Sequence, residues 1–179
     1  MRNVKASLRD LLLNGNLGGL RPGMAERAAI AALGARPDRT NADPRDGRRA
    51  SWKCGSLELF FSAIGPGPLR LGMIFTDDYH DLGRLIRRGG GLTLDPWILV
   101  PGLTLRRLLD ELRRIGAGHA TVPGPAYGWK IARTVVLDRT GVRVAFRSER
   151  YWDLENGERA KLHPGQRAEF RISSISAVR

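Results

Sequence analysis

The segment LRPGM at 20–24 decides the fold, because it places a Pro-Gly pair directly before a helical pattern, and VPGLT at 100–104 does the same. The first helical pattern runs to about residue 34 and the second to about residue 116, and both end at a glycine suited to a left-handed helix stop. Three apolar positions recur at a shift of 79 residues: Met24, Ile30 and Leu33 correspond to Leu103, Leu109 and Leu112. Such self-similarity predicts an internal repeat.

Strand-like sequence follows each helical pattern. Apolar side chains alternate in LELFF (57–61) and in VRVAF (142–146), which places them on one face of a strand. A further strand follows in each half, LRLGMIF (69–75) and AEFRI (168–172). Each half therefore combines a helix with several short strands.

A hairpin pattern is clearest in the second half. Residues 130–137 predict a strand, 138–141 a turn that contains glycine, and 142–147 the returning strand. Trp52 marks the corresponding first strand of the first half. The polar segment 36–49 contains two prolines and predicts a mobile loop.

These elements predict an α+β fold made of two tandem repeats. The first repeat is residues 1–95, with a leading helix at 7–13, and the second is residues 96–179. In each repeat, one or two helices pack on an antiparallel sheet of about three or four strands. A short helix at 79–88 is expected near the junction.

The first half also carries a family resemblance. LRPGM, a helix ending in ALG (32–34), and WKCGSLEL (52–59) resemble the outer-membrane assembly lipoproteins of the SmpA/OmlA type. A tandem pair of such units is similar to the β-lactamase inhibitory proteins, in which two helix-on-sheet repeats form a concave sheet that grips a protein partner. The resemblance implies a sheet face that binds protein. The chain departs from those secreted, disulfide-bonded inhibitors because Cys54 is its single cysteine, and no lipidation cysteine lies near Met1.

The composition predicts a folded chain in a reducing compartment. Hydrophobic residues make up 42% and charged residues 27%, as in ordinary globular proteins. No apolar run approaches the ~20 residues that span a bilayer, and the N-terminal residues do not resemble a secretory signal. A single cysteine excludes an intramolecular disulfide, so we expect a cytoplasmic protein. Because no apolar run is long enough to span a bilayer, we expect no membrane partner.

The charge is strongly positive. The net charge is +12, and 26 of the 30 cationic residues are arginine. Arginine suits phosphates or carboxylates because its guanidinium binds them with two parallel hydrogen bonds, although a GC-rich genome also encodes arginine where another encodes lysine. The excess of cations implies at least weak attraction to polyanions at low salt.

No catalytic, cofactor or metal site is predicted. His80, His119 and His163 lie far apart and belong to no known motif. Cys54 occupies a strand position typical of a small buried residue. The segment TDDYHD (76–81) holds possible metal ligands, but it lacks the spacing of a calcium loop, and a helix cap explains its acids.

Candidate partner-binding residues lie at strand positions expected to face outward and in one arginine-aromatic segment. They are Glu58, Phe60, Arg70, Ile74, Arg143, Arg147, Arg150, Tyr151, Trp152 and Arg171. Phe60 and Ile74 are either interface anchors or part of a core shared between the halves. The arginines of the second half predict a basic stripe, and arginine beside aromatic side chains suits a protein interface or base stacking.

The expected function is a non-enzymatic protein-binding module that inhibits or sequesters one partner, as immunity proteins do with toxins. A basic inhibitor suits an acidic enzyme through electrostatic steering. The alternative is a nucleic-acid or other polyanion binder that uses a basic surface nonspecifically. No cofactor is expected, and the oligomeric state stays open.

Overall fold

The computed structural model describes residues 4–34, 39–42, 49–54, 57–63, 67–76, 92–124, 132–148 and 170–178. The described helices are α1 (Leu8–Asn14), α2 (Glu26–Leu33) and α3 (Leu105–Arg114). The described strands are β1 (Val4–Ser7), β2 (Arg39–Ala42), β3 (Arg49–Cys54), β4 (Leu57–Ser62), β5 (Arg70–Thr76), β6 (Leu92–Asp95), β7 (His119–Pro123), β8 (Ala132–Leu137), β9 (Arg143–Ser148) and β10 (Phe170–Val178). The leading helix is confirmed as α1, and the helix expected at 79–88 lies outside the described residues.

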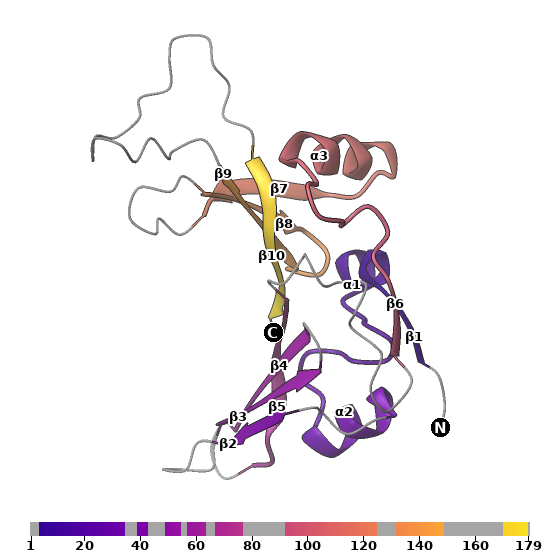
Figure 1. The fold of residues 1–179 in the computed structure, drawn as a ribbon, viewed down its shortest axis with the longest axis vertical. Coiled ribbons are helices and arrows are strands. Elements are labelled where there is room, and N and C mark those ends of the chain that lie inside the picture. The colour runs from indigo at the N-terminus through magenta and orange to yellow at the C-terminus, as the bar shows by residue number, and fades with distance from the viewer. Residues whose placement is uncertain are drawn as a thin grey trace, which may run out of the picture.

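Eight of the described strands form one antiparallel sheet in the order β2-β3-β4-β5-β10-β9-β8-β7 (Figure 1). The strands of the first half occupy one side of this order and those of the second half the other. The C-terminal strand β10 lies in the middle, because it pairs with both β5 and β9. The strands β1 and β6 form a separate parallel pair. The predicted α+β class is confirmed.

The two Pro-Gly segments form the same kind of turn. Gly23 has a φ of 93° and Gly102 a φ of 82°, values that glycine adopts readily because it has no Cβ. Proline followed by a left-handed glycine is the signature of a type II turn. Each turn is closed by one backbone hydrogen bond, from Met24 N to Arg21 O at 3.2 Å and from Leu103 N to Val100 O at 3.0 Å.

Each turn is bonded to the centre of the sheet. Leu71 N in β5 donates to Met24 O at 2.7 Å, and Ile172 N in β10 donates to Leu103 O at 2.9 Å. These bonds hold the start of α2 against β5 and the start of α3 against β10. Because β5 and β10 are the two central strands, both helices begin over the middle of the sheet.

The helices cover one face of the sheet (Figure 1). Their buried residues are Leu8, Leu11 and Leu12 in α1, Ala29 and Leu33 in α2, and Leu108 and Leu112 in α3. The predicted alternation is confirmed, since Leu57, Leu59 and Phe61 join this cluster together with Val142, Val144 and Phe146. Burying one such side chain stabilises a fold by about 1.5–3 kcal/mol, so this face is the core.

Part of the predicted loop at 36–49 is a strand. The segment β2 pairs with β3 and places Thr40 opposite Trp52. It lies between Pro37 and Pro44, and an edge strand tolerates proline at its ends because only one of its sides needs hydrogen bonds. At the opposite edge, β7 is exposed from residue 120 to residue 123 and therefore lacks the alternation that marks a strand in sequence.

The predicted hairpin is confirmed as β8 and β9. Gly141 has a φ of 68°, and Leu137 N donates to Val142 O at 2.9 Å. Thr140 Oγ1 in the turn donates to Leu12 O of α1 at 2.7 Å. The hairpin of the second half is therefore tied to the first helix of the chain.

We expect Gly102→Ala to lower the free energy of unfolding by about 1–2 kcal/mol. Its φ is +82°, and a Cβ built there has no atom within 4 Å, so the cost comes from the backbone alone. Urea unfolding followed by circular dichroism measures it. Gly72→Ala is the control, because Gly72 lies outside the left-handed region and its Cβ would meet Ser62 Oγ at an ordinary 3.5 Å. Equal losses in the two variants would contradict the turn assignment.

Candidate functional site

Strand residues that alternate with the core point to the face of the sheet opposite the helices, which we call the outer face. The strand register places one row of these residues across seven strands: Lys53, Glu58, Phe75, Ser176, Arg143, Val136 and Ala120. This row contains the predicted site residues Glu58 and Arg143, which belong to different halves of the sequence. One continuous face therefore carries candidate residues from both halves.

Apolar side chains gather on the outer face of the first half. The rings of Phe60 and Phe75 meet edge to face, with centroids 6.5 Å apart, and both side chains are partly exposed. Met73 lies opposite Phe60 in the register and also opposite Val178, which is 44% exposed. We call these four residues the aromatic patch. An edge-to-face pair adds about 0.5–1.5 kcal/mol to the effect of burial, so the two rings also fix each other's position.

The prediction that Ile74 lies on the outer face is wrong. Its side chain is only 1% exposed and belongs to the core. The cause is a β-bulge, because the pairing between β4 and β5 shifts after Phe60 and skips Gly72. One extra residue reverses the alternation beyond it. Phe75 therefore takes the outer position that the sequence pattern assigned to Ile74.

Exposed arginines mark the outer face of the second half. Arg143 and Arg147 lie on β9 with Ala145 between them, and four residues along a strand separate them by about 13 Å. Arg171 stands opposite Arg147 in the register. Small side chains occupy the neighbouring outer positions: Ser174 and Ser176 on β10, and Ala132 and Thr134 on β8, which are buried at 8% and 7% exposure. The structure thus places the three predicted arginines on adjacent strands.

Two predicted charged residues of the first half make local contacts. Glu58 Oε1 accepts a hydrogen bond from Lys53 Nζ at 3.1 Å, and these side chains are 29% and 53% exposed. Exposed ion pairs contribute at most about 1 kcal/mol, so a partner can displace this one. Arg70 Nη1 donates to Gly23 O at 3.0 Å. Arg70 therefore braces the first Pro-Gly turn.

Other residues considered from sequence fall elsewhere. Arg150, Tyr151, Trp152, His80, His163 and residues 77–81 lie outside the described residues. His119 on β7 has Nδ1 2.8 Å from Ala117 O, and Cys54 ends β3 opposite Leu57. Within the described part of the chain, no three His, Cys, Asp or Glu residues are grouped to hold a metal ion.

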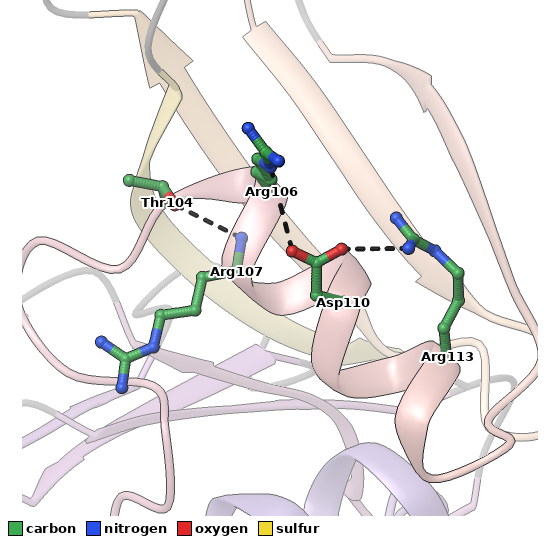
Figure 2. A network of polar contacts seen from close by, with 5 residues as sticks. All are labelled: Thr104, Arg106, Arg107, Asp110 and Arg113. Atoms are coloured by element: carbon green, nitrogen blue, oxygen red, sulfur yellow. Dashed lines mark hydrogen bonds and ion pairs between the residues drawn. The ribbon is translucent and has the colours of Figure 1, made fainter.

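Helix α3 carries a charged face that is not among the predicted site residues. Thr104 Oγ1 caps the helix by accepting from Arg107 N at 3.3 Å. Asp110 lies between two guanidinium groups, 4.0 Å from Arg106 Nε and 3.0 Å from Arg113 Nη1 (Figure 2). The sequence signal is RRLLDELRR at 106–114, in which charges recur three, four and seven residues apart.

A second carboxylate on α3 is held more firmly. Arg114 donates two hydrogen bonds to Glu111, at 2.6 and 2.7 Å, and the Glu111 side chain is only 18% exposed. The hydrogen bond from Arg114 lowers the pKa of Glu111, and the positive charges of Arg9 and Arg107 lower it further. Arg9 belongs to α1, and its guanidinium lies 6.0 Å from the ring centroid of Trp97. Charges from two helices therefore meet at Glu111.

No protein-family model, curated protein or solved structure matches this chain. No helix in the described ranges is both long and apolar enough to cross a membrane.

We expect Ile74→Ala to lower the free energy of unfolding by about 2–5 kcal/mol, because it opens a cavity in the core. Phe75→Ala should cost less than about 1.5 kcal/mol, since its partly exposed ring loses mainly the edge contact with Phe60. Urea unfolding of the two variants gives the comparison. A cost for Phe75→Ala equal to or above that for Ile74→Ala would contradict the assignment of the bulge to Gly72.

Glu111→Gln should destabilise the protein at neutral pH, and the difference from the wild type should shrink as the pH falls. The folded-state pKa of Glu111 lies below its ordinary value of 4.5, chiefly through the hydrogen bond from Arg114. A carboxylate with a lowered pKa contributes stability above its unfolded pKa and loses it as the pH falls through the folded pKa. Urea midpoints measured from pH 7 down to about pH 2.5 test this, and a constant difference would contradict it.

Proposed function

We propose that this protein is a non-enzymatic binding module that inhibits or sequesters one partner protein, in the manner of an immunity protein. The outer face of the sheet is the proposed binding surface. The aromatic patch is the observation that carries the proposal, because clustered apolar side chains on an exposed sheet face favour association with a partner. The exposed arginines beside it fit the same role, since aromatic residues and arginine are enriched among the residues that dominate binding energy at protein interfaces.

We infer further that the sheet is built from two tandem repeats, residues 1–95 and 96–179. Four features recur at the shift of 79 residues: the positive-φ pair Gly23 and Gly102, and the buried pairs Leu20 and Leu99, Ala29 and Leu108, and Leu33 and Leu112. In each half, the turn before the helix accepts a hydrogen bond from a central strand of the eight-stranded sheet, β5 in the first half and β10 in the second. These correspondences support duplication of one helix-on-sheet unit.

The proposed mechanism is occlusion of the partner's functional site. Eight strands spaced at about 4.8 Å span about 34 Å, a width suited to the roughly 800 Å² per partner of a stable protein interface. The net charge of +12 favours an acidic partner, because opposite charge accelerates association. The cytoplasm is the proposed location, since the single cysteine suits a reducing compartment.

The arginines of the second half favour one alternative, a nucleic acid or another polyanion. Arg143 and Arg147 are exposed on β9, and Arg171 is next to Arg147 in the register. Guanidinium groups bind phosphate with paired, charge-assisted hydrogen bonds. Binding to a polyanion falls steeply as the salt concentration rises, whereas an interface centred on apolar contacts does not. Salt dependence therefore separates the two functions.

We expect Phe60→Glu to abolish capture of the partner, because it places a charge inside the aromatic patch. Affinity capture from nuclease-treated native lysate, at about 0.15 and 0.5 M salt, compares this variant with the wild type. The wild type should retain one acidic protein under both conditions. The amount of that protein retained by the variant should be at least about tenfold lower, as expected for an interface hot spot.

Ile30→Glu is the matched control, since Ile30 is 40% exposed on α2, on the helix side of the sheet. It introduces the same charge and should retain the partner. Circular dichroism checks that both variants fold. Capture of nucleic acid alone, lost as the salt rises and unchanged by Phe60→Glu, would contradict the proposal and support the polyanion alternative.

A further inference from the structure

The charged face of α3 is organised as two parallel rows. Residues four and seven positions apart on a helix lie on one side of it. The first row is Arg106, Asp110 and Arg113, and the second is Arg107, Glu111 and Arg114. Each row thus has a carboxylate between two guanidinium groups, and the face alternates in sign along the helix axis.

The charged side chains of the first row form ion pairs with one another. Asp110 contacts both of its arginines, and the side chains of Arg106, Asp110 and Arg113 are 87%, 54% and 64% exposed. Such exposed pairs in helices contribute little to stability, because water screens them. This row is a solvated helix surface.

The second row carries unbalanced positive charge. Glu111 bonds to Arg114, whereas the guanidinium of Arg107 makes no hydrogen bond or ion pair within the part of the chain that the structure describes and points away from Asp110 (Figure 2). Arg9 approaches from α1, and both Arg9 and Arg107 lower the pKa of Glu111. Glu111 is therefore bonded to one guanidinium group and lies in the electrostatic field of two more, Arg9 and Arg107.

An aromatic ring adjoins this charge. Trp97 is partly buried beneath Arg9 and has a φ of 53°, in the left-handed region that bulky residues rarely adopt. The backbone N–H of Trp97 donates to Asp95 Oδ1 at 2.9 Å, which holds the turn. Asp95 Oδ2 also accepts from Ser7 Oγ at 3.2 Å. The end of β6 thus holds Trp97 beside Arg9 of α1.

We propose that Arg9, Trp97, Arg107 and Arg114 form a second docking surface, which binds an acidic helical segment of a protein. Carboxylates of that segment would pair with Arg107 and Arg114, Arg9 would add to the attraction, and an apolar side chain would contact Trp97. The residues Arg107 and Arg114 are two helical turns, about 10.5 Å, apart, so acidic side chains seven residues apart in a helix match them. This surface lies on the helix side of the sheet and does not rest on the function proposed for the outer face.

The alternating signs favour a protein over a nucleic acid. A phosphate backbone carries uniform negative charge, and it would pass Asp110 and Glu111 as it followed the helix. Like charges brought together cost binding energy and so exclude such a partner. A protein segment can instead place a basic residue between its acidic ones. The pattern that complements the second row is acidic, basic, acidic.

A designed peptide tests the proposal directly. The probe is a fluorescein-labelled helical peptide of about 15 residues, with glutamates seven residues apart, a lysine between them and one leucine, and a permuted peptide of the same composition is the control. Fluorescence anisotropy should show binding to the wild type at least about tenfold tighter than to the permuted peptide. Arg9→Glu with Arg107→Glu should weaken binding by about tenfold or more, since two attractive charges become repulsive.

Arg139→Glu is the control variant, because Arg139 is an exposed arginine in the turn after β8 and undergoes the same charge change. It should bind as the wild type does, and so should Phe60→Glu, which separates this surface from the outer face. Equal binding of the permuted peptide would overturn the proposal. A single-stranded DNA of about 15 nucleotides is the second comparison. If it bound more tightly than the designed peptide at about 0.15 M salt, the proposal would be overturned in favour of a nucleic acid.

Discussion

The pairing of β10 with β5 is the constraint on which the rest of the structure depends. It joins strands about 100 residues apart in sequence and places Ile175 opposite Thr76 and Ala177 opposite Ile74. Without β10, both β5 and β9 would be sheet edges, and Leu103 O in the turn before α3 would lose the hydrogen bond that it accepts from Ile172 N. One strand thus joins the two halves of the sheet, completes the core and anchors a helix.

A single inserted residue decides what the outer face presents. The skipped pairing at Gly72 reverses the alternation of β5, so Ile74 enters the core at the junction with β10 and Phe75 faces outward beside Phe60. Without the bulge, the outer position would hold an aliphatic side chain, and an aromatic ring would enter a core already filled by Phe61 and Ile175. Core packing and surface chemistry are therefore set by the same backbone feature.

Local signals were predictable from the sequence, and pairing-dependent ones were not. The Pro-Gly turns, the α3 leucines and the hairpin at Gly141 depend on neighbouring residues, so the pattern alone identifies them. The edge strand β7 lacks the alternating pattern because its residues 120 to 123 are exposed, and β2 is only four residues long. Ile74 was assigned to the wrong face because a bulge depends on the partner strand as well as on the strand itself. The second row of α3 was visible as a charge run, but its importance depends on Arg9 and Trp97, which lie on other elements.

The two surfaces differ in the physics that would govern their partners. The aromatic patch gains free energy by excluding water, a term that salt weakens little, and it would mainly slow dissociation. The second row of α3 acts through exposed charge, which is screened within about 8 Å at physiological salt and would mainly accelerate association. They lie on opposite sides of one sheet, yet Thr140 ties the β8–β9 hairpin to α1, which carries Arg9. A partner that engaged both would combine fast capture with slow release, whereas two separate partners would respond differently to the same change in salt.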